Sequence, residues 1–354
     1  MKKIDIYSMT PEELREYFVS IGEPKFRASQ VFPRLARGER VEEITSLSKK
    51  LRERLSAEIL DTLPTIDLKL TSKIDGTVKY LFRLFDGACV EGVLMKYKHG
   101  NTLCISTQVG CRMGCKFCAS TIAGRERDLL PSELLGQIIA AEKDSGERVD
   151  NVVMMGIGEP LDNFDNVVKF LKLVNHEDGL NIGYRHISLS TCGIVPKIRE
   201  LAELDLPITL SISLHASDDE KRSAIMPVNK KWNIDALLSA CADYYKKTGR
   251  RISFEYTLIS GKNDSAEDAR TLAGLLKKYL SPIRAPIHVN LIRVNEVTET
   301  GFKAGTVDSA KAFAKRLEEL GVVATVRRRL GSDVNAACGQ LRRSRNEKNE
   351  EKED

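Results

Sequence analysis

The sequence predicts an α/β protein, a partial (β/α)6 barrel with a small N-terminal helical domain and a β-hairpin extension. Three observations carry this prediction. Strand-like and helix-like segments alternate from about residue 101 to 330, residues 66 to 107 alternate apolar and polar side chains, and residues 1 to about 62 have helical patterns. Alternating strands and helices favour a parallel sheet with right-handed crossovers.

The N-terminal segment is expected to form short helices. Thr10 and Glu13 have the spacing of a capping box, and Pro11 stands at the first helical position. Residues 21 to 55 hold nine Lys or Arg against five Asp or Glu. Such a run is usually a solvated helical face, and an RNA-contacting face is the alternative.

The hairpin extension is predicted from two turn dipeptides. Asp75-Gly76 and Asp86-Gly87 separate runs that alternate apolar and polar residues. The run TLCISTQVGC that follows is expected to be a single strand, ending at a cluster of cysteines. The hairpins are expected to cover one edge of the barrel.

Six βα units are expected after the hairpins, too few for a closed eight-unit barrel. After TLCISTQVGC, the predicted strands are 151–156, 186–190, 208–215, 252–259 and 287–292, with a last strand-like run, VVATVRRR, behind them. The expected organisation is a helical RNA-binding domain (1–62), a hairpin extension (63–100), a barrel with a C-terminal catalytic loop (101–341) and a disordered tail (342–354). In such sheets, ligand sites lie at the C-terminal ends of the strands.

Composition excludes several classes of protein. Hydrophobic residues make up 42% of the 354 residues and charged residues 30%, which is the balance of a globular chain. The apolar runs are shorter than the roughly 18 residues of a membrane span, and the N-terminus does not resemble a signal peptide. We therefore expect a cytoplasmic protein without a membrane partner. The net charge of +5 permits a nucleic-acid partner without requiring one.

Three of the eight cysteines form the motif C-x3-C-x2-C, at Cys111, Cys115 and Cys118. Three thiolates on one loop can bind three irons of a [4Fe–4S] cluster and leave the fourth iron open. The alternative is a structural zinc site with a remote fourth ligand, although zinc sites favour two paired C-x2-C elements. Gly114 would help the loop wrap, and Phe117 would shield a cluster from water.

The motif resembles that of radical S-adenosylmethionine (SAM) enzymes, and the wider sequence resembles the RlmN/Cfr family of RNA adenine methyltransferases. The matching segments are CISTQVGCRMGCKFCAST, GIGEPLDN, SLSTCG, SLHA and AACGQL, in this order. The resemblance implies methylation of carbon 2 of adenosine in 23S rRNA and in tRNA. Carbon 8 methylation of rRNA, which confers antibiotic resistance, and a zinc-stabilised RNA-binding protein are the alternatives.

The resemblance also implies a reaction path, because an electron-poor ring carbon cannot take a methyl group from SAM by polar transfer. Cys338 is first methylated by one SAM. A second SAM is cleaved to a 5′-deoxyadenosyl radical, which removes a hydrogen from that methyl group. The carbon radical then adds to adenine, and Glu91 accepts the ring proton. Cys104 finally attacks the Cys338 sulfur, which releases the methylated RNA and leaves a Cys104–Cys338 disulfide in the protein.

The residues themselves allow plainer interpretations of these three positions. Cys338 lies in the small-residue segment NAACGQL, yet a buried free cysteine is the commoner case. Cys104 could equally be a core residue. Glu91 lies beside apolar Val90 and Val93, which suits a general base, but it could also be a solvent-facing strand residue.

Polar residues that follow the predicted strands are the expected SAM contacts. Glu159 can pair with the ligand's positive charge, and glycine at 158 allows close backbone approach. An ordinary strand-to-helix turn is the alternative for GIGEP. The full set of expected contacts is Gly158, Glu159, Ser190, Ser213, Leu214, His215 and Asn295.

The remaining expectations concern cysteines, basic residues and partners. Cys89, Cys192 and Cys241 are expected to be bystanders. A further group of basic residues either flanks the mouth of the site and holds phosphates or is ordinary surface charge; it comprises Arg112, Lys116, Arg125, Arg127, Arg327, Arg328 and Arg329. An external electron donor such as flavodoxin or ferredoxin is implied, and the protein is expected to be a monomer.

Overall fold

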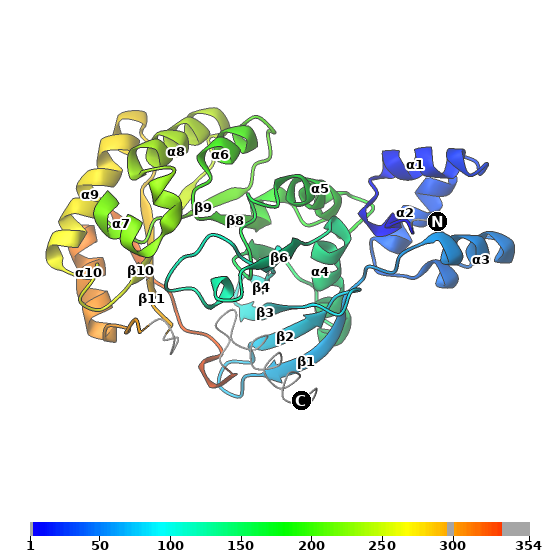
Figure 1. Cartoon of the computed structure of the whole chain (residues 1–354), viewed down its shortest axis with the longest axis horizontal. Coiled ribbons are helices and arrows are strands. Elements are labelled where there is room, and N and C mark those ends of the chain that lie inside the picture. The colour runs from blue at the N-terminus through cyan, green and yellow to red at the C-terminus, as the bar shows by residue number, and fades with distance from the viewer. Residues whose placement is uncertain (1–2, 296–300, 335–354) are drawn as a thin grey trace.

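The computed structural model describes residues 3–295 and 301–334, and it confirms an open α/β barrel. One ten-stranded sheet has the order β1-β2-β3-β4-β7-β8-β9-β10-β11-β12 (Figure 1). From β4 to β12 all neighbouring strands are parallel. These parallel strands are β4 (Gly100–Cys104), β7 (Asn151–Met154), β8 (Ile187–Thr191), β9 (Thr209–Ser213), β10 (Ile252–Leu258), β11 (His288–Arg293) and β12 (Val323–Val326).

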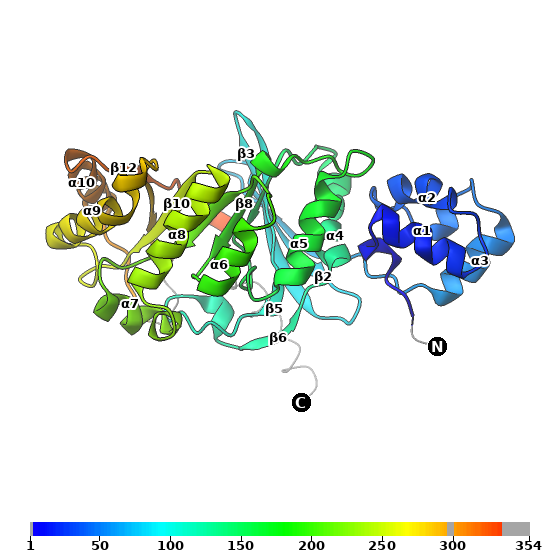
Figure 2. The ribbon, with the colours of Figure 1, turned by 90° about the horizontal axis from the view of Figure 1, so that it is seen from above.

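Helices connect successive parallel strands and cover the outer face of the sheet (Figures 1 and 2). They are α4 (Pro131–Ser145), α5 (Phe164–Asn175), α6 (Val195–Ala202), α7 (Asp219–Ile225), α8 (Ile234–Thr248), α9 (Ala266–Leu280) and α10 (Val307–Glu319). The six expected βα units are therefore present. The short helix α7 and the 3-10 turn η5 (Pro227–Lys230) were not expected.

The hairpins extend the barrel sheet along one edge, as the turn dipeptides predict. Strands β1 (Thr65–Thr71), β2 (Val78–Arg83) and β3 (Cys89–Tyr97) pair antiparallel, and β3 pairs antiparallel with β4. Gly76 and Gly87 have φ of +72° and +86°, which only glycine adopts without strain. Beyond Thr71 the hairpin tip contacts the end of the described chain, where Ser72 donates to Asp333 over 2.7 Å.

The expectation of one strand over TLCISTQVGC is wrong. The main-sheet strand ends at Cys104, and β5 (Gln108–Gly110) pairs instead with β6 (Arg125–Asp128) in a separate two-stranded ribbon. The backbone turns because the N–H groups of Thr107 and Gln108 both donate to the carbonyl of Ile157. A Cβ at Gly110 would lie 1.9 Å from the Gly124 carbonyl oxygen, so the close approach of the ribbon strands requires glycine there.

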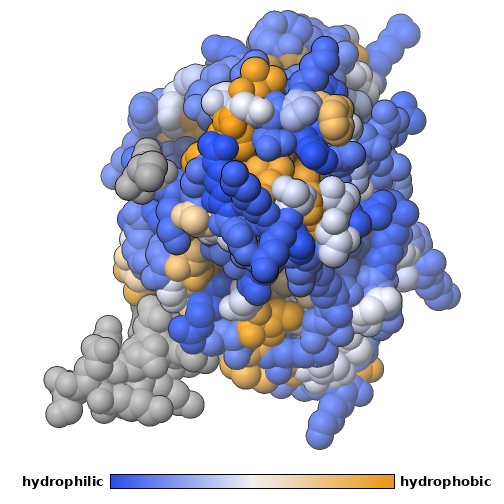
Figure 3. All heavy atoms as spheres, turned by 90° about the vertical axis from the view of Figure 1, so that its right-hand side faces the viewer, coloured by the Kyte–Doolittle hydropathy of each residue, from blue (hydrophilic) through white to orange (hydrophobic). Residues whose placement is uncertain are grey.

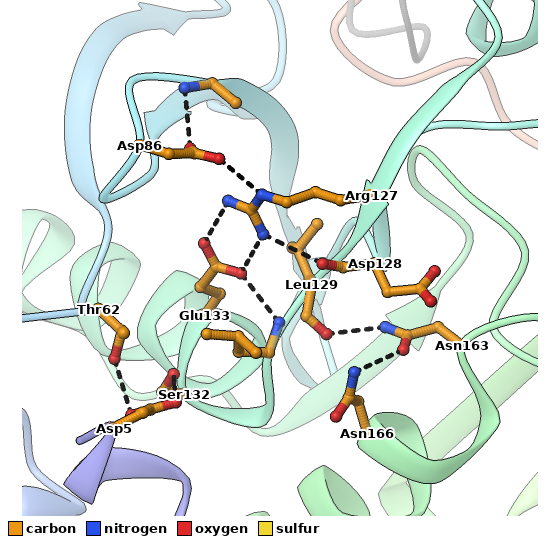
Figure 4. Close-up of polar contacts among 12 residues, drawn as sticks. Asp5, Thr62, Asp86, Arg127, Asp128, Leu129, Ser132, Glu133, Asn163 and Asn166 are labelled. Atoms are coloured by element: carbon orange, nitrogen blue, oxygen red, sulfur yellow. Dashed lines mark hydrogen bonds and ion pairs between the residues drawn. The ribbon is translucent and has the colours of Figure 1, made fainter. Parts of the chain in front are cut away.

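The N-terminal helices form a separate unit beside α4 and α5 (Figure 2). Helices α1 (Pro11–Ser20), α2 (Arg27–Leu35) and α3 (Lys49–Glu58) surround an apolar core, and the capping box of Thr10 and Glu13 is present. The face of the molecule at this end is mostly hydrophilic, with separate apolar patches (Figure 3). Asp5 joins the unit to the barrel, since it accepts from Ser132 over 2.8 Å and from Thr62 over 3.0 Å (Figure 4).

Two sequence predictions lie outside the described residues, namely the catalytic loop with Cys338 and the tail 342–354. Within the described residues, no helix combines the length and apolar character needed to cross a bilayer.

Candidate functional site

A cavity of about 260 Å³ opens at the C-terminal ends of the parallel strands. One wall is the loop with Cys111, Cys115 and Cys118. The remaining walls come from the C-terminal parts of β7, β8, β9, β10 and β11 and the residues that follow them, together with Met226 and Arg327. Parallel strands point their carboxyl ends to the same edge, so segments far apart in the sequence meet there.

The three cysteines lie on a tightly bonded loop. The Cys111 N–H donates to the Gly124 carbonyl over 2.9 Å, and the Cys118 N–H donates to the Cys115 carbonyl over 3.0 Å. Gly114 has φ +71°, in agreement with its expected role in wrapping the loop. Phe117 lines the cavity and packs edge-on against the His215 ring, with 5.0 Å between the centroids.

The environment of the thiols does not favour bare thiolates. Burial raises the pKa of the Cys111 thiol to about 12, and it raises the pKa of Cys115 as well. Iron ligation requires thiolates, and a bound cation supplies the positive charge that stabilises them. The thiols of this loop would therefore become thiolates only when a metal cation is bound beside them.

Within residues 3–295 and 301–334, no three His, Cys, Asp or Glu side chains converge on a point for one metal ion. In a [4Fe–4S] cluster each cysteine binds a different iron, so the ligands need not converge. Three thiols on one wall of the cavity suit a cluster with one open iron better than a single zinc ion.

Gly158 and Glu159 hold the cavity wall together. Gly158 has φ +107°, and a Cβ there would lie 2.7 Å from the backbone nitrogen of Gln108. The Glu159 carboxylate accepts from the N–H groups of Cys192 over 2.8 Å and Leu161 over 3.0 Å. Burial raises the pKa of Glu159, while those N–H groups oppose the rise. The glutamate thus ties the β7–α5 loop to the end of β8.

His215 follows β9 and is fixed as a neutral imidazole. Its Nδ1 accepts from the Thr257 N–H over 3.0 Å, which leaves the ring proton on Nε2. Burial, with the charge of Arg222 as a smaller cause, lowers the pKa of His215 to about 3. The residue has φ +56°, and Asn263 donates to its carbonyl over 2.8 Å. His215 therefore presents a hydrogen-bond donor to the cavity at neutral pH.

The other expected SAM contacts divide into two groups. Ser190, Ser213 and Asn295 line the cavity together with Gly158, Glu159 and His215. Leu214 differs, because its side chain is in the core and is not among the residues lining the cavity. Its backbone N–H donates to the Glu255 carbonyl and its own carbonyl accepts from Arg222, so any contact of Leu214 with a ligand is made by its backbone and not by its side chain.

Glu91 and Cys104 lie on one face of the sheet. Cys104 pairs with Val93 across β3 and β4, and Glu91 is two residues from Val93 on the same side. Glu91 is fully buried, so it is not a solvent-facing strand residue, and its carboxylate lies 3.1 Å from the Lys79 ammonium. Cys104 packs with Val93, Met95, Met155 and Leu330, and Met155 also lines the cavity.

The basic residues predicted near the site have different partners. Arg127 donates to both oxygens of Glu133 and to Asp86, which makes it a structural residue at the start of α4 (Figure 4). Arg112 pairs with Asp162 and Arg125 with Asp128. Arg327 is the member of this group that lines the cavity.

Sequence reasoning missed several polar residues around the cavity. Glu255 and Thr257 of β10 line it, and Asn290 donates to the Glu255 carboxylate over 2.7 Å. Cys192, expected to be a bystander, also lines the cavity. Alternation along the strand ISFEYTL was the available signal, because it puts Glu255 and Thr257 on one face.

Comparison with known proteins agrees with this geometry. Residues 105–273 match the radical SAM superfamily, and residues 4–60 match the ribosomal RNA large subunit methyltransferase N-terminal domain. The chain is 52% identical to the probable dual-specificity RNA methyltransferase RlmN of Alkaliphilus oremlandii, over 97% of this chain and 98% of that protein. The Clostridium perfringens protein of the same name is also 52% identical, over 96% and 97% of the two chains.

The chain belongs to the RlmN family of radical SAM methyltransferases. A crystal structure of a radical SAM methyltransferase from Sphaerobacter thermophilus is similar throughout, with a TM-score of 0.89 and 39% identity over 95% of this chain and 98% of that one. Membership of the superfamily implies SAM and an iron–sulfur cluster as cofactors. The similarity to the RlmN proteins extends over both the helical unit and the barrel, and the N-terminal domain model matches the helical unit.

Proposed function

We propose that this RlmN-family enzyme methylates carbon 2 of adenosine in 23S rRNA, at the peptidyl transferase centre, and in tRNA, 3′ of the anticodon. The observation that carries the proposal is the three-cysteine loop at the wall of the cavity, in a chain whose full-length relatives are named dual-specificity RNA methyltransferases. These names favour carbon 2 over the carbon 8 alternative.

The cofactor sites follow from the cavity. Cys111, Cys115 and Cys118 would hold a [4Fe–4S] cluster, which when bound supplies the electron that cleaves SAM. Polar groups from the strand ends would hold SAM itself, with His215 donating from Nε2 and Glu159 close to its ammonium group. The proposed contact set remains Gly158, Glu159, Ser190, Ser213, Leu214, His215 and Asn295, with Leu214 acting through its backbone.

Three side chains would carry the methyl transfer. Cys338 would carry the methyl group on its sulfur, Glu91 would take the ring proton, and Cys104 would attack the Cys338 sulfur and release the RNA. The common face of Glu91 and Cys104 supports this pairing. Lys79 would hold the Glu91 carboxylate in place when it is charged.

The biological setting follows from the same proposal. RNA substrates would place the enzyme in the cytoplasm, and a flavodoxin or ferredoxin would supply electrons to a monomeric protein. The helical domain (1–62) would contact RNA, and the hairpin extension (63–100) would support the catalytic face of the barrel domain (101–341).

A nucleoside analysis tests the product. The anaerobically reconstituted protein is incubated with reductant, SAM and unmodified 23S rRNA or tRNA, and the digested nucleosides are separated by chromatography with mass detection. We expect 2-methyladenosine from both RNAs. An 8-methyl product, or a colourless protein that binds zinc and no iron after reconstitution, would contradict the proposal.

A trapping experiment tests the two thiols. The Cys104→Ala variant should accumulate RNA covalently bound to the protein, because the thioether at Cys338 has no resolving thiol. Cys338→Ala should abolish both methylation and trapping, and Cys89→Ala serves as the control with normal turnover. Normal turnover by Cys104→Ala would remove Cys104 from the mechanism.

A further inference from the structure

Arg222 is a wholly buried cation in α7. Within the described ranges 3–295 and 301–334, no Asp or Glu oxygen forms an ion pair with its guanidinium. Its Nη1 donates to the amide oxygen of Asn229 over 2.9 Å, and its remaining bonds go to backbone carbonyls. A guanidinium keeps its proton in proteins, so a positive charge is buried here with neutral groups in direct contact with it. The Asp219 carboxylate lies one step further out, where it accepts from the Asn229 amide over 2.8 Å.

The carbonyls that Arg222 binds belong to the two segments behind the cavity wall. Nη2 donates to the Cys192 carbonyl over 2.7 Å and to the Ser213 carbonyl over 3.1 Å, and Nε donates to Leu214 over 3.1 Å. Cys192 follows β8, and Ser213 ends β9. One side chain therefore fixes the spacing of the two strand ends that present Ser190, Ser213 and His215.

The helix that carries Arg222 also supports the cysteine loop. The Lys116 N–H, between Cys115 and Cys118, donates to the carbonyl of Ile225 over 2.9 Å. Met226, the next residue, lines the cavity with the cysteines. Cys192, whose carbonyl accepts from Arg222 over 2.7 Å, lines the same cavity as the three cysteines of the loop, so the guanidinium lies directly behind the cavity wall.

We propose that Arg222 is a positioning residue whose buried charge raises the reduction potential of the cluster held by the cysteine loop. The proposal rests on the proposed function, since it requires the cluster to be bound. Reduction adds one negative charge to the cluster, and a fixed cation nearby in a low-dielectric interior stabilises the reduced form. The same hydrogen bonds hold Ser213 and His215 in position for SAM.

An anaerobic redox titration monitored by electron paramagnetic resonance tests the charge. Arg222→Gln should shift the midpoint potential of the reconstituted cluster to a more negative value than in the wild type. Arg222→Lys keeps the charge but has fewer donors, so its potential should stay near the wild type while its affinity for SAM falls. Lys221→Gln is the matched control, because the side chain of that neighbouring lysine is partly exposed and pairs with Asp268. The midpoint potential of the cluster in this variant should equal that of the wild type.

A second variant keeps the test open if Arg222→Gln does not retain the cluster. The double variant Asp219→Asn with Asn229→Asp leaves Arg222 in place. It moves the carboxylate from residue 219, which accepts from the Asn229 amide over 2.8 Å, to the position 2.9 Å from Nη1. A carboxylate next to the guanidinium should lower the potential in the same direction. A wild-type potential in either variant, at full cluster occupancy, would overturn the proposal. Failure of the wild type to bind any cluster would instead refute the proposed function.

Discussion

At the residue scale, the Lys79–Glu91 pair shows how a buried charge is held on the face of the sheet that also carries Cys104. Both side chains are at most 1% exposed, and 3.1 Å separates their charged atoms. Removing one member of such a pair leaves the other charge buried, which typically costs about 3–5 kcal/mol. We expect Lys79→Met to lower the free energy of unfolding in urea by about this amount.

A double variant separates the lost charge from lost packing. Lys79→Met with Glu91→Gln leaves no charge from this pair in the interior, so its stability should lie closer to the wild type than that of Lys79→Met alone. Equal destabilisation of the single and double variants would show that the pair is not electrostatically coupled.

His215 makes a pH prediction with a defined sign. Its pKa is lowered from 6.5 to about 3 in the folded protein, so the unfolded chain binds the extra proton first as the pH falls. Stability should therefore decrease from about pH 6.5 downward, by a few kcal/mol near pH 3 for this group alone. The loss should be smaller in His215→Asn, which tolerates the left-handed backbone and keeps an acceptor near Nδ1.

Unfolding in urea measured at several pH values checks this. The carboxylates of the protein also titrate in this pH range. The relevant quantity is therefore the difference in unfolding free energy between the wild type and His215→Asn at each pH. If that difference is constant from pH 7 to pH 4, His215 does not remain neutral in the folded state.

At the element scale, the periodic segments were predictable, and each exception has an identifiable physical cause. The parallel strands and the long helices have clear patterns, because each buries one face or one stripe. The ribbon β5–β6 was missed because paired donation to the Ile157 carbonyl, 49 residues away from Gln108, ends the main strand. Arg222 was missed because a charged residue in the short segment DDEKRSAI resembles a solvated helix.

The β7–α5 loop gives a prediction about backbone geometry. Gly158→Ala adds a Cβ 2.7 Å from the Gln108 backbone at φ +107°, so the loop must move away from β5. We expect SAM affinity to fall at least tenfold and stability to fall by about 1–3 kcal/mol. Gly249→Ala is the matched control, since it also has positive φ (+61°) but no atom within 4 Å of the new Cβ.

Equilibrium dialysis of labelled SAM against both variants measures the difference. Gly249→Ala should lose some stability, as a helix C-cap glycine does, and bind SAM as the wild type does. Equal SAM affinity in the two variants would mean that the loop position does not control the site.

At the scale of the whole molecule, the site joins residues that the sequence could name but not arrange. The cysteine motif and the strand-end residues were identifiable because each follows a recognisable segment. The pairing of Glu91 with Lys79 depends on strand register, and the meeting of Cys104 with Leu330 depends on the path of the chain after β12. Neither register nor such long-range paths follow from local patterns.

The attachment of the N-terminal helices gives a prediction about the whole chain. Asp5 accepts from Thr62 and Ser132 (Figure 4). It also accepts from Ser8, and the Ser132 N–H donates to the Ser8 hydroxyl, so one carboxylate connects the helical unit, the linker and α4. Asp5→Ala leaves buried Ser132 without that acceptor, which should cost about 1–3 kcal/mol. Hydrogen exchange should accelerate at residues 4–8 and at the start of α4, while the strands of the barrel keep their protection.

Asp61→Ala is the control, because its ion pair with Arg40 is exposed at both ends and such pairs contribute about 0–1 kcal/mol. Because the helical unit is proposed to contact RNA, Asp5→Ala should also weaken methylation of RNA more than it weakens SAM binding; unchanged exchange at α4 would show that the unit is held by other contacts.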